Sequence, residues 1–160
     1  MKKIREKFTI VERLLFLLVL IIIIIIMIPI ISDKIEKPKK DKAKKDAETY
    51  VEIVNQYLKD VKENNEELFN EIIKYNSVSK FCSITDEEAQ ELKCGDTKLD
   101  IKNKNYIIGQ DSIIYFSKEG NVEGYKIIID GYKVSYPNSK GLTSIKKYTP
   151  KKEDVLSKEV

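Results

Sequence analysis

Histidine is absent from this chain of 160 residues, and no arginine occurs after Arg13. Without histidine, the chain lacks the commonest general base and a favoured ligand of transition metals. Without arginine, the part after residue 13 lacks the side chain best suited to bidentate phosphate contacts, so we expect no direct nucleic-acid binding. This composition argues against an enzyme, and we expect no cofactor.

The carboxylates do not replace the missing histidine. The acidic residues of the charged stretches are not spaced as an acid/base pair or as a metal cage. We therefore interpret them as solvated and expect no metal site. They include Glu66, Glu67, Asp86, Glu87 and Glu88.

Charged and hydrogen-bonding side chains are both absent from Leu14 to Ile31. As a helix this run spans about 27 Å, close to the hydrocarbon thickness of a bilayer. It is longer than the apolar region of a cleavable secretory signal, and no small-residue cleavage site follows it. We expect one membrane-spanning helix, which leaves enough chain for one modest domain.

The flanking charges do not orient this helix. Five Lys or Arg residues precede the apolar run, and seven Lys follow it within residues 32–45. A positive-inside count therefore leans slightly against a cytoplasmic N-terminus. Any placement of the C-terminal part outside the cytoplasm has to rest on another argument.

Cysteine is scarce, with only Cys82 and Cys94. On an oxidising side of the membrane, such a pair favours a disulfide, and closing a loop of about a dozen residues contributes roughly 3 kcal/mol. The alternative is two buried free thiols on the cytoplasmic side. A disulfide here would be structural, because the CxxC spacing of redox motifs is missing.

Residues 32–48 are highly charged and contain Pro38, which predicts that a helix kinks or restarts there. Helical periodicity begins within this stretch, at Ala43. Between Ala43 and Val61, apolar residues recur in steps of three and four, which predicts an amphipathic helix with one buried stripe. A second, short helix is predicted around Leu68–Ile73. A third is predicted over 85–95, from a capping-box pattern and a closing glycine.

The period then changes to two, which predicts strands over 111–117, 122–130, 132–137 and 142–148. Asp130-Gly131 between two of these runs is a strong hairpin signal. We expect an antiparallel meander of three or four strands. Its buried face needs a cover, and the amphipathic stripe is the obvious candidate.

The N-terminal residues resemble a known family. The string Phe8-Thr9-Ile10-Val11-Glu12 before an apolar run is similar to the start of type IV pilins and pseudopilins, which also carry a proline about 17 residues after the glutamate. Here that proline is Pro29. The sequence match covers about residues 5–31, and the rest of the chain is similar in architecture only.

This resemblance implies roles for four residues. A prepilin peptidase would cleave between Lys7 and Phe8, and the new amine of Phe8 would be methylated. Glu12 would pair with the N-terminal amine of a neighbouring subunit, and Pro29 would lie where the helix loosens in a filament. Two positions depart from the family, since Lys7 replaces a glycine and Arg13 replaces an apolar residue.

Without the resemblance, both features have plainer interpretations. Glu12 and Arg13 would form an interfacial pair before an ordinary anchor, and Pro29 would mark the end of that anchor. The spacing of 17 residues between Glu12 and Pro29 favours the filament interpretation, because an anchor needs neither residue.

We therefore expect an α+β fold, with a membrane-spanning helix whose amphipathic extension packs on a small C-terminal antiparallel sheet. Its predicted parts are a basic leader (1–7), a transmembrane and assembly helix (8–31), a charged linker with an amphipathic helix (32–63), a globular head (64–148) and a polar tail (149–160). The expected function is that of a filament subunit: a pilin, a minor pilin, or a secretion or competence pseudopilin.

The expected partners are the membrane, other pilin-like subunits and a prepilin peptidase. The resemblance places the chain in the cell membrane as a single-pass protein, with its head outside the cytoplasm and a cell-surface filament as its assembled form. The alternative is a single-pass membrane protein with a small extracytoplasmic binding or sensory domain that never polymerises.

Overall fold

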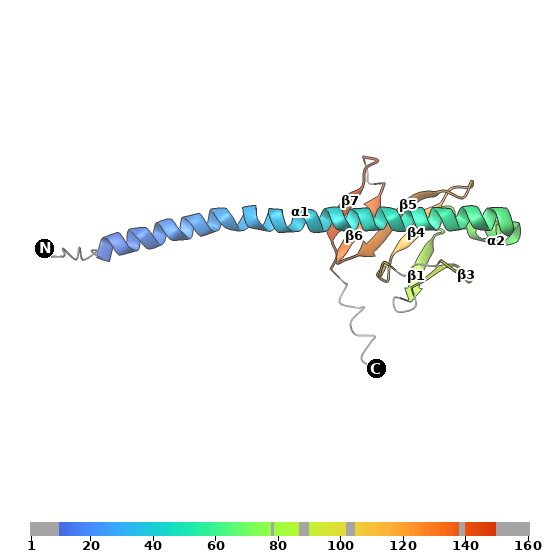
Figure 1. Ribbon diagram of the computed structural model, residues 1–160, viewed down its shortest axis with the longest axis horizontal. Coiled ribbons are helices and arrows are strands. Elements are labelled where there is room, and N and C mark those ends of the chain that lie inside the picture. The colour runs from blue at the N-terminus through green and yellow to red at the C-terminus, as the bar shows by residue number, and fades with distance from the viewer. Residues whose placement is uncertain (1–9, 78, 87–89, 102–104, 138–139, 150–160) are drawn as a thin grey trace, which may run out of the picture. The chain divides into compact units, whose positions relative to one another are not determined.

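The computed structural model describes residues 10–77, 79–86, 90–101, 105–137 and 140–149. The chain divides into two compact units, Met1–Lys39 and Lys40–Val160. Helix α1 (Ile10–Asn64) begins in the first unit and ends in the second. Every other helix and strand that the structure describes belongs to the second unit (Figure 1).

Helix α1 contains both Pro29 and Pro38 in its interior. The helix therefore does not restart at Pro38, which was one of the two alternatives for that position. Further along, the predicted amphipathic stripe is confirmed. Its buried members recur every three or four residues and are Ala43, Ala47, Tyr50, Val54, Leu58 and Val61.

Helix α2 (Glu66–Ile73) is the predicted short helix, and its apolar face buries Phe69 and Ile72. The chain leaves α1 at Asn64, and Asn65 starts α2 as its N-cap. The Asn65 side chain accepts a hydrogen bond from the backbone N–H of Leu68 at 3.1 Å. Such caps satisfy one of the free N–H groups of a helix start, so the turn between the helices is locally encoded.

Within the described residues, seven antiparallel strands form one sheet in the order β3-β2-β1-β4-β5-β6-β7. The strands are β1 (Cys82–Asp86), β2 (Glu91–Cys94), β3 (Thr97–Leu99), β4 (Ile113–Phe116), β5 (Val122–Ile129), β6 (Tyr132–Tyr136) and β7 (Ser144–Lys147). The predicted meander is confirmed as β4 to β7. Asp130 and Gly131 have φ values of 50° and 76°, as the mirror-image turn of a two-residue hairpin requires.

The helix predicted over 85–95 is wrong. Residues 85–86 end β1 and residues 91–94 form β2, while 87–89 lie outside the described residues. The capping-box pattern is a local signal, and pairing with neighbouring strands outweighs it. Leu92 and Cys94 alternate with less buried residues, as in a half-buried strand. Gly95, with φ of 60°, turns the chain into β3 rather than ending a helix.

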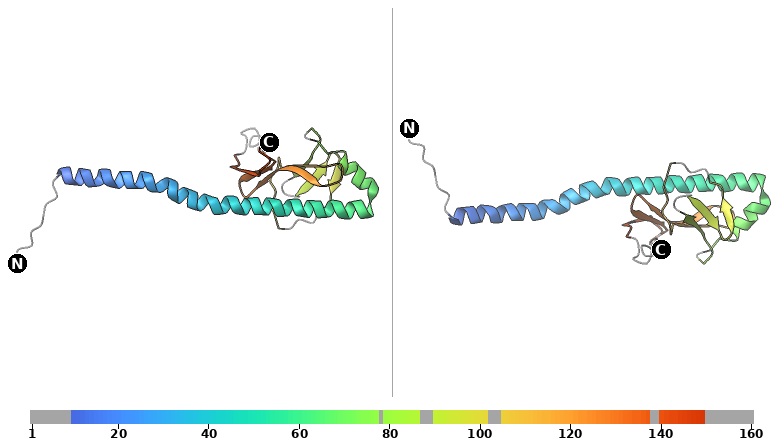
Figure 2. Two further views of the ribbon diagram at one scale, coloured as in Figure 1. Left: turned by 90° about the horizontal axis from the view of Figure 1, so that it is seen from above. Right: turned by 90° about the horizontal axis from the view of Figure 1, so that it is seen from below.

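The core lies between the sheet and the later part of α1. Cys94, Cys82, Ile114 and Tyr125 lie opposite one another across β2, β1, β4 and β5. All four are buried in one cluster with the α1 stripe and the apolar face of α2. The two helices therefore cover one face of the sheet, and Figure 2 shows this part of α1 running along one side of the strands.

Candidate membrane and assembly segment

The apolar segment Leu14–Ile31 is a helical surface with no protein cover. Within the chain, its large apolar side chains are exposed by 40% at Leu20 to 68% at Phe16. The most apolar window of α1 has a mean hydropathy of 3.7, and none of it is buried. A core helix of a soluble protein would be mostly buried. By length and composition this helix can cross a membrane, and lipid is the medium that suits such a surface.

Glu12 lies in the first described turn of α1. Carboxylates are favourable there, because the helix dipole places partial positive charge at its N-terminal end. Arg13 follows directly and therefore projects about 100° around the helix axis from Glu12. The two charged residues directly precede the apolar run, which begins at Leu14.

Pro29 lies inside α1, two residues before the apolar run ends at Ile31. A proline has no N–H, so Pro29 offers no donor to the carbonyl of Ile25 four residues earlier. Along a helix, Glu12 and Pro29 are separated by about 26 Å. They do not form one local site, and any joint role requires contacts of the whole segment with other molecules.

The predicted cleavage position, Lys7 and Phe8, lies outside the described residues. Peptidase cleavage there and methylation of Phe8 stay predictions. Among the residues that the structure describes, no three His, Cys, Asp or Glu side chains gather as metal ligands do.

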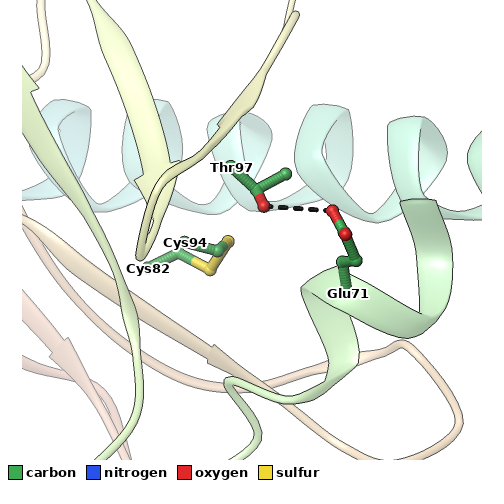
Figure 3. The surroundings of a disulfide bond; sticks show 4 residues. All are labelled: Glu71, Cys82, Cys94 and Thr97. Carbon is green, nitrogen blue, oxygen red and sulfur yellow. Dashed lines mark hydrogen bonds between the residues drawn. A yellow bond between two sulfur atoms is a disulfide. The ribbon is translucent and has the colours of Figure 1, made fainter. Parts of the chain in front are cut away.

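Cys82 and Cys94 form a disulfide, as the sequence favoured. They lie directly opposite each other on β1 and β2, and both side chains are fully buried. Figure 3 shows the bond close to a second link, in which the Thr97 hydroxyl donates to the Glu71 carboxylate at 3.3 Å. The hydrogen bond ties β3 to α2 next to the disulfide, and the two together staple this end of the sheet.

Sequence reasoning missed one group of polar residues on the sheet. Lys126, Lys133 and Lys146 lie on the face turned away from α1, on three neighbouring strands. The alternation along each strand could have shown that each lysine points away from the core. Their proximity depends on strand register, which the sequence does not display.

Comparison with known protein families, characterised proteins and solved structures finds no match to this chain. The fold is nevertheless α+β and pilin-like, with a long N-terminal apolar helix and an antiparallel sheet. The chain thus contains a helix that resembles a membrane anchor and a small β domain with a disulfide.

Proposed function

We propose that this protein is a structural subunit of a type IV pilus-like filament, without enzymatic activity. One observation carries the proposal. The first part of helix α1 is an exposed apolar segment, which follows Glu12 and includes Pro29. The later part of the same helix packs on an antiparallel sheet. An ordinary anchor requires neither the carboxylate nor the proline.

Before assembly, Leu14–Ile31 holds the subunit in the membrane. In the filament the same surface packs against the apolar segments of neighbouring subunits. Lipid is as apolar as these side chains, so association relies on close packing and on complementary polar groups. A carboxylate at the edge of the hydrocarbon can serve as such a polar group, because a cation on a neighbouring subunit can pair with it. In our proposal, the partner of Glu12 is the amine of a neighbouring Phe8, released by a prepilin peptidase.

The head lies outside the cytoplasm in this proposal. Support comes from the disulfide between Cys82 and Cys94, since disulfides form and persist in oxidising compartments. In this proposal, Pro29 lets the helix loosen when the subunit moves from the membrane into the filament. One missing backbone hydrogen bond lowers the cost of extending the helix near that residue.

The proposal is tested by mass spectrometry of the N-terminus together with crosslinking in intact cells. The expected mature chain starts at a methylated Phe8 and gives a ladder of crosslinked multimers. Glu12→Ala should abolish the ladder without removing the chain from the membrane fraction. Asp33→Ala, a carboxylate of the same helix beyond the apolar run, is the matched control and should assemble normally.

Lys7 and Arg13 favour a second candidate, because each departs from the family at a position used in processing or packing. This candidate is a single-pass membrane protein whose extracytoplasmic head binds or senses a ligand and never polymerises. It predicts a membrane-bound monomer that keeps Met1 to Lys7. That result would exclude the filament proposal.

A further inference from the structure

The sheet face turned away from α1 carries a row of side chains that is polar except at its middle position, Ile113. Its members are chain neighbours of the buried row described above, so they project to the opposite face. Strand pairing aligns one residue from every strand in this row. From β3 to β7 the row reads Lys98, Lys93, Ser83, Ile113, Lys126, Ser135 and Ser144.

Three lysines gather at the β7 end of this face. Lys133 is directly opposite Lys146, and Lys126 is diagonal to Lys133 because its own partner is Ser135. Diagonal neighbours on a sheet are about 7–8 Å apart, within reach of long side chains. We call Lys126, Lys133 and Lys146 the lysine cluster.

The lysine cluster is not neutralised within the part of the chain that the structure describes. None of its three ammonium groups takes part in an ion pair there. At the β3 end of the same face, by contrast, Glu91 lies 3.4 Å from Lys93 and also pairs with Lys98. The hydrogen bond from Lys98 lowers the pKa of Glu91, so this carboxylate stays ionised and neutralises its neighbours.

Stability does not explain the lysine cluster. Like charges directly opposite on a sheet are destabilising, so the pair of Lys133 and Lys146 works against the fold. Lysine does protect edge strands from pairing with other chains, which can account for Lys146 on β7. Lys126 and Lys133 lie on β5 and β6, which have neighbours on both sides, so edge protection does not account for them.

We propose that the lysine cluster binds a flexible polyphosphate chain that carries no nucleobases. Lysine is a compact charge on a flexible stem and accepts phosphates in many orientations. Ser135 and Ser144 lie opposite each other beside the cluster, and their hydroxyls can donate to phosphate oxygens.

Two features favour a polymer without bases over a nucleic acid. The head contains no arginine, the usual side chain for bidentate contacts with the edges of bases. Single-stranded nucleic acids also require exposed aromatic rings on which bases stack. Within the strands, the aromatic ring on this face is Tyr115, which lies opposite Gly124 and occupies the space that a side chain there would fill. Beyond the end of β7, the hydroxyl of Tyr148 donates a hydrogen bond to the Asp111 carboxylate at 3.4 Å.

The test uses the full chain in uncharged detergent micelles and measures binding of labelled inorganic polyphosphate by fluorescence anisotropy. Lys146→Glu should weaken binding on the order of ten-fold and flatten its salt dependence. Lys147→Glu is the matched control, because it makes the same charge change one residue later, on the other face of β7. This control should bind within about two-fold of the wild type, since Lys147 lies outside the cluster.

Loss of fold cannot mimic the expected result. Lys146→Glu places a carboxylate opposite Lys133, so its melting temperature should equal or exceed that of the wild type. Equal weakening by both variants would reduce the effect to net charge and overturn the proposal, as would unchanged binding by Lys146→Glu. Tighter binding of a single-stranded DNA with the same number of phosphates would also overturn the choice of a base-free polymer.

Discussion

Single polar residues join α1 to the sheet alongside the apolar stripe. The amide oxygen of Asn55 accepts a hydrogen bond from the backbone N–H of Val122 at 2.9 Å, and this contact is partly buried. Val122 begins β5, so the bond links the helix to the first residue of the longest strand. Removing only the acceptor of such a bond leaves a buried N–H without a partner. This costs more free energy than replacing both the donor and the acceptor by apolar groups.

We expect Asn55→Ala to lower the free energy of unfolding of the head by about 1–3 kcal/mol, because it orphans the N–H of Val122. Chemical denaturation of the full chain in detergent measures this loss. The neighbouring Gln56→Ala is the control, since Gln56 is exposed and its amide donates a hydrogen bond to Asp60 of the same helix. Equal losses in both variants would show that the link to β5 contributes nothing specific.

Buried Tyr50 makes the free energy of unfolding depend on pH in the alkaline range. Burial raises the pKa of its phenol well above the ordinary value, and burial also raises the pKa of Tyr125. In the unfolded chain, a tyrosine ionises near pH 10. The raised folded pKa therefore contributes stability that is complete below about pH 10 and declines as pH rises further.

The expected slope for Tyr50 alone is at most about 1.4 kcal/mol per pH unit. Tyr50→Phe should lose part of this decline and keep the part that belongs to Tyr125. Urea unfolding of both proteins at pH 8 and near pH 11 provides the comparison. An identical decline in wild type and variant would contradict the assignment to Tyr50.

The strands β1 and β2 are joined by a covalent link in addition to their backbone pairing. The disulfide joins directly opposite residues 12 positions apart, and β1 connects this pair to β4 and the rest of the sheet. Reduction should destabilise the head by about 3 kcal/mol, because the unfolded chain regains the freedom of the closed loop.

Thermal unfolding with and without a reductant measures this contribution. The double variant Cys82→Ala, Cys94→Ala is the control, and reductant should leave its melting temperature unchanged. If reductant lowered the melting temperature of the variant as much as that of the wild type, the effect would not come from this disulfide.

The elements also show where local patterns are reliable. The stripe from Ala43 to Val61 predicted the buried face of α1, because a long amphipathic period has few alternative interpretations. Asp130-Gly131 predicted its hairpin, because both residues tolerate the left-handed backbone that the turn requires. Over 85–95 the local signals suited a helix, yet residues 91–94 pair with β1 and β3 and form the strand β2.

For the whole molecule, the two units differ in what stabilises them. Among the described residues, every member of the buried core lies at Ala43 or later, so the second unit contains its own core. The apolar segment of the first unit is not buried by the rest of the chain, and by length and composition it can cross a membrane. The second unit, Lys40–Val160, should therefore fold without residues 1–39.

We expect a chain of residues 40–160 to be soluble and monomeric, and to melt within a few degrees of the full-length head. Circular dichroism and gel filtration test the fold and the oligomeric state. As the matched control, residues 1–39 fused to an unrelated soluble domain should stay in the membrane fraction. An unfolded 40–160 chain would show that the head needs the first unit.

The sequence by itself determined the apolar helix, the amphipathic stripe, the last four strands and the positions of Glu12 and Pro29. These features are periodic or local, so neighbouring residues are enough to define them. Tertiary structure alone decided that residues 82–86 and 91–94 are strands, that the sheet has seven strands, and which polar residues share its outer face. The reason is physical: strand pairing joins residues far apart in the chain, and a register shift of one residue would turn the side chains of the shifted strand to the other face.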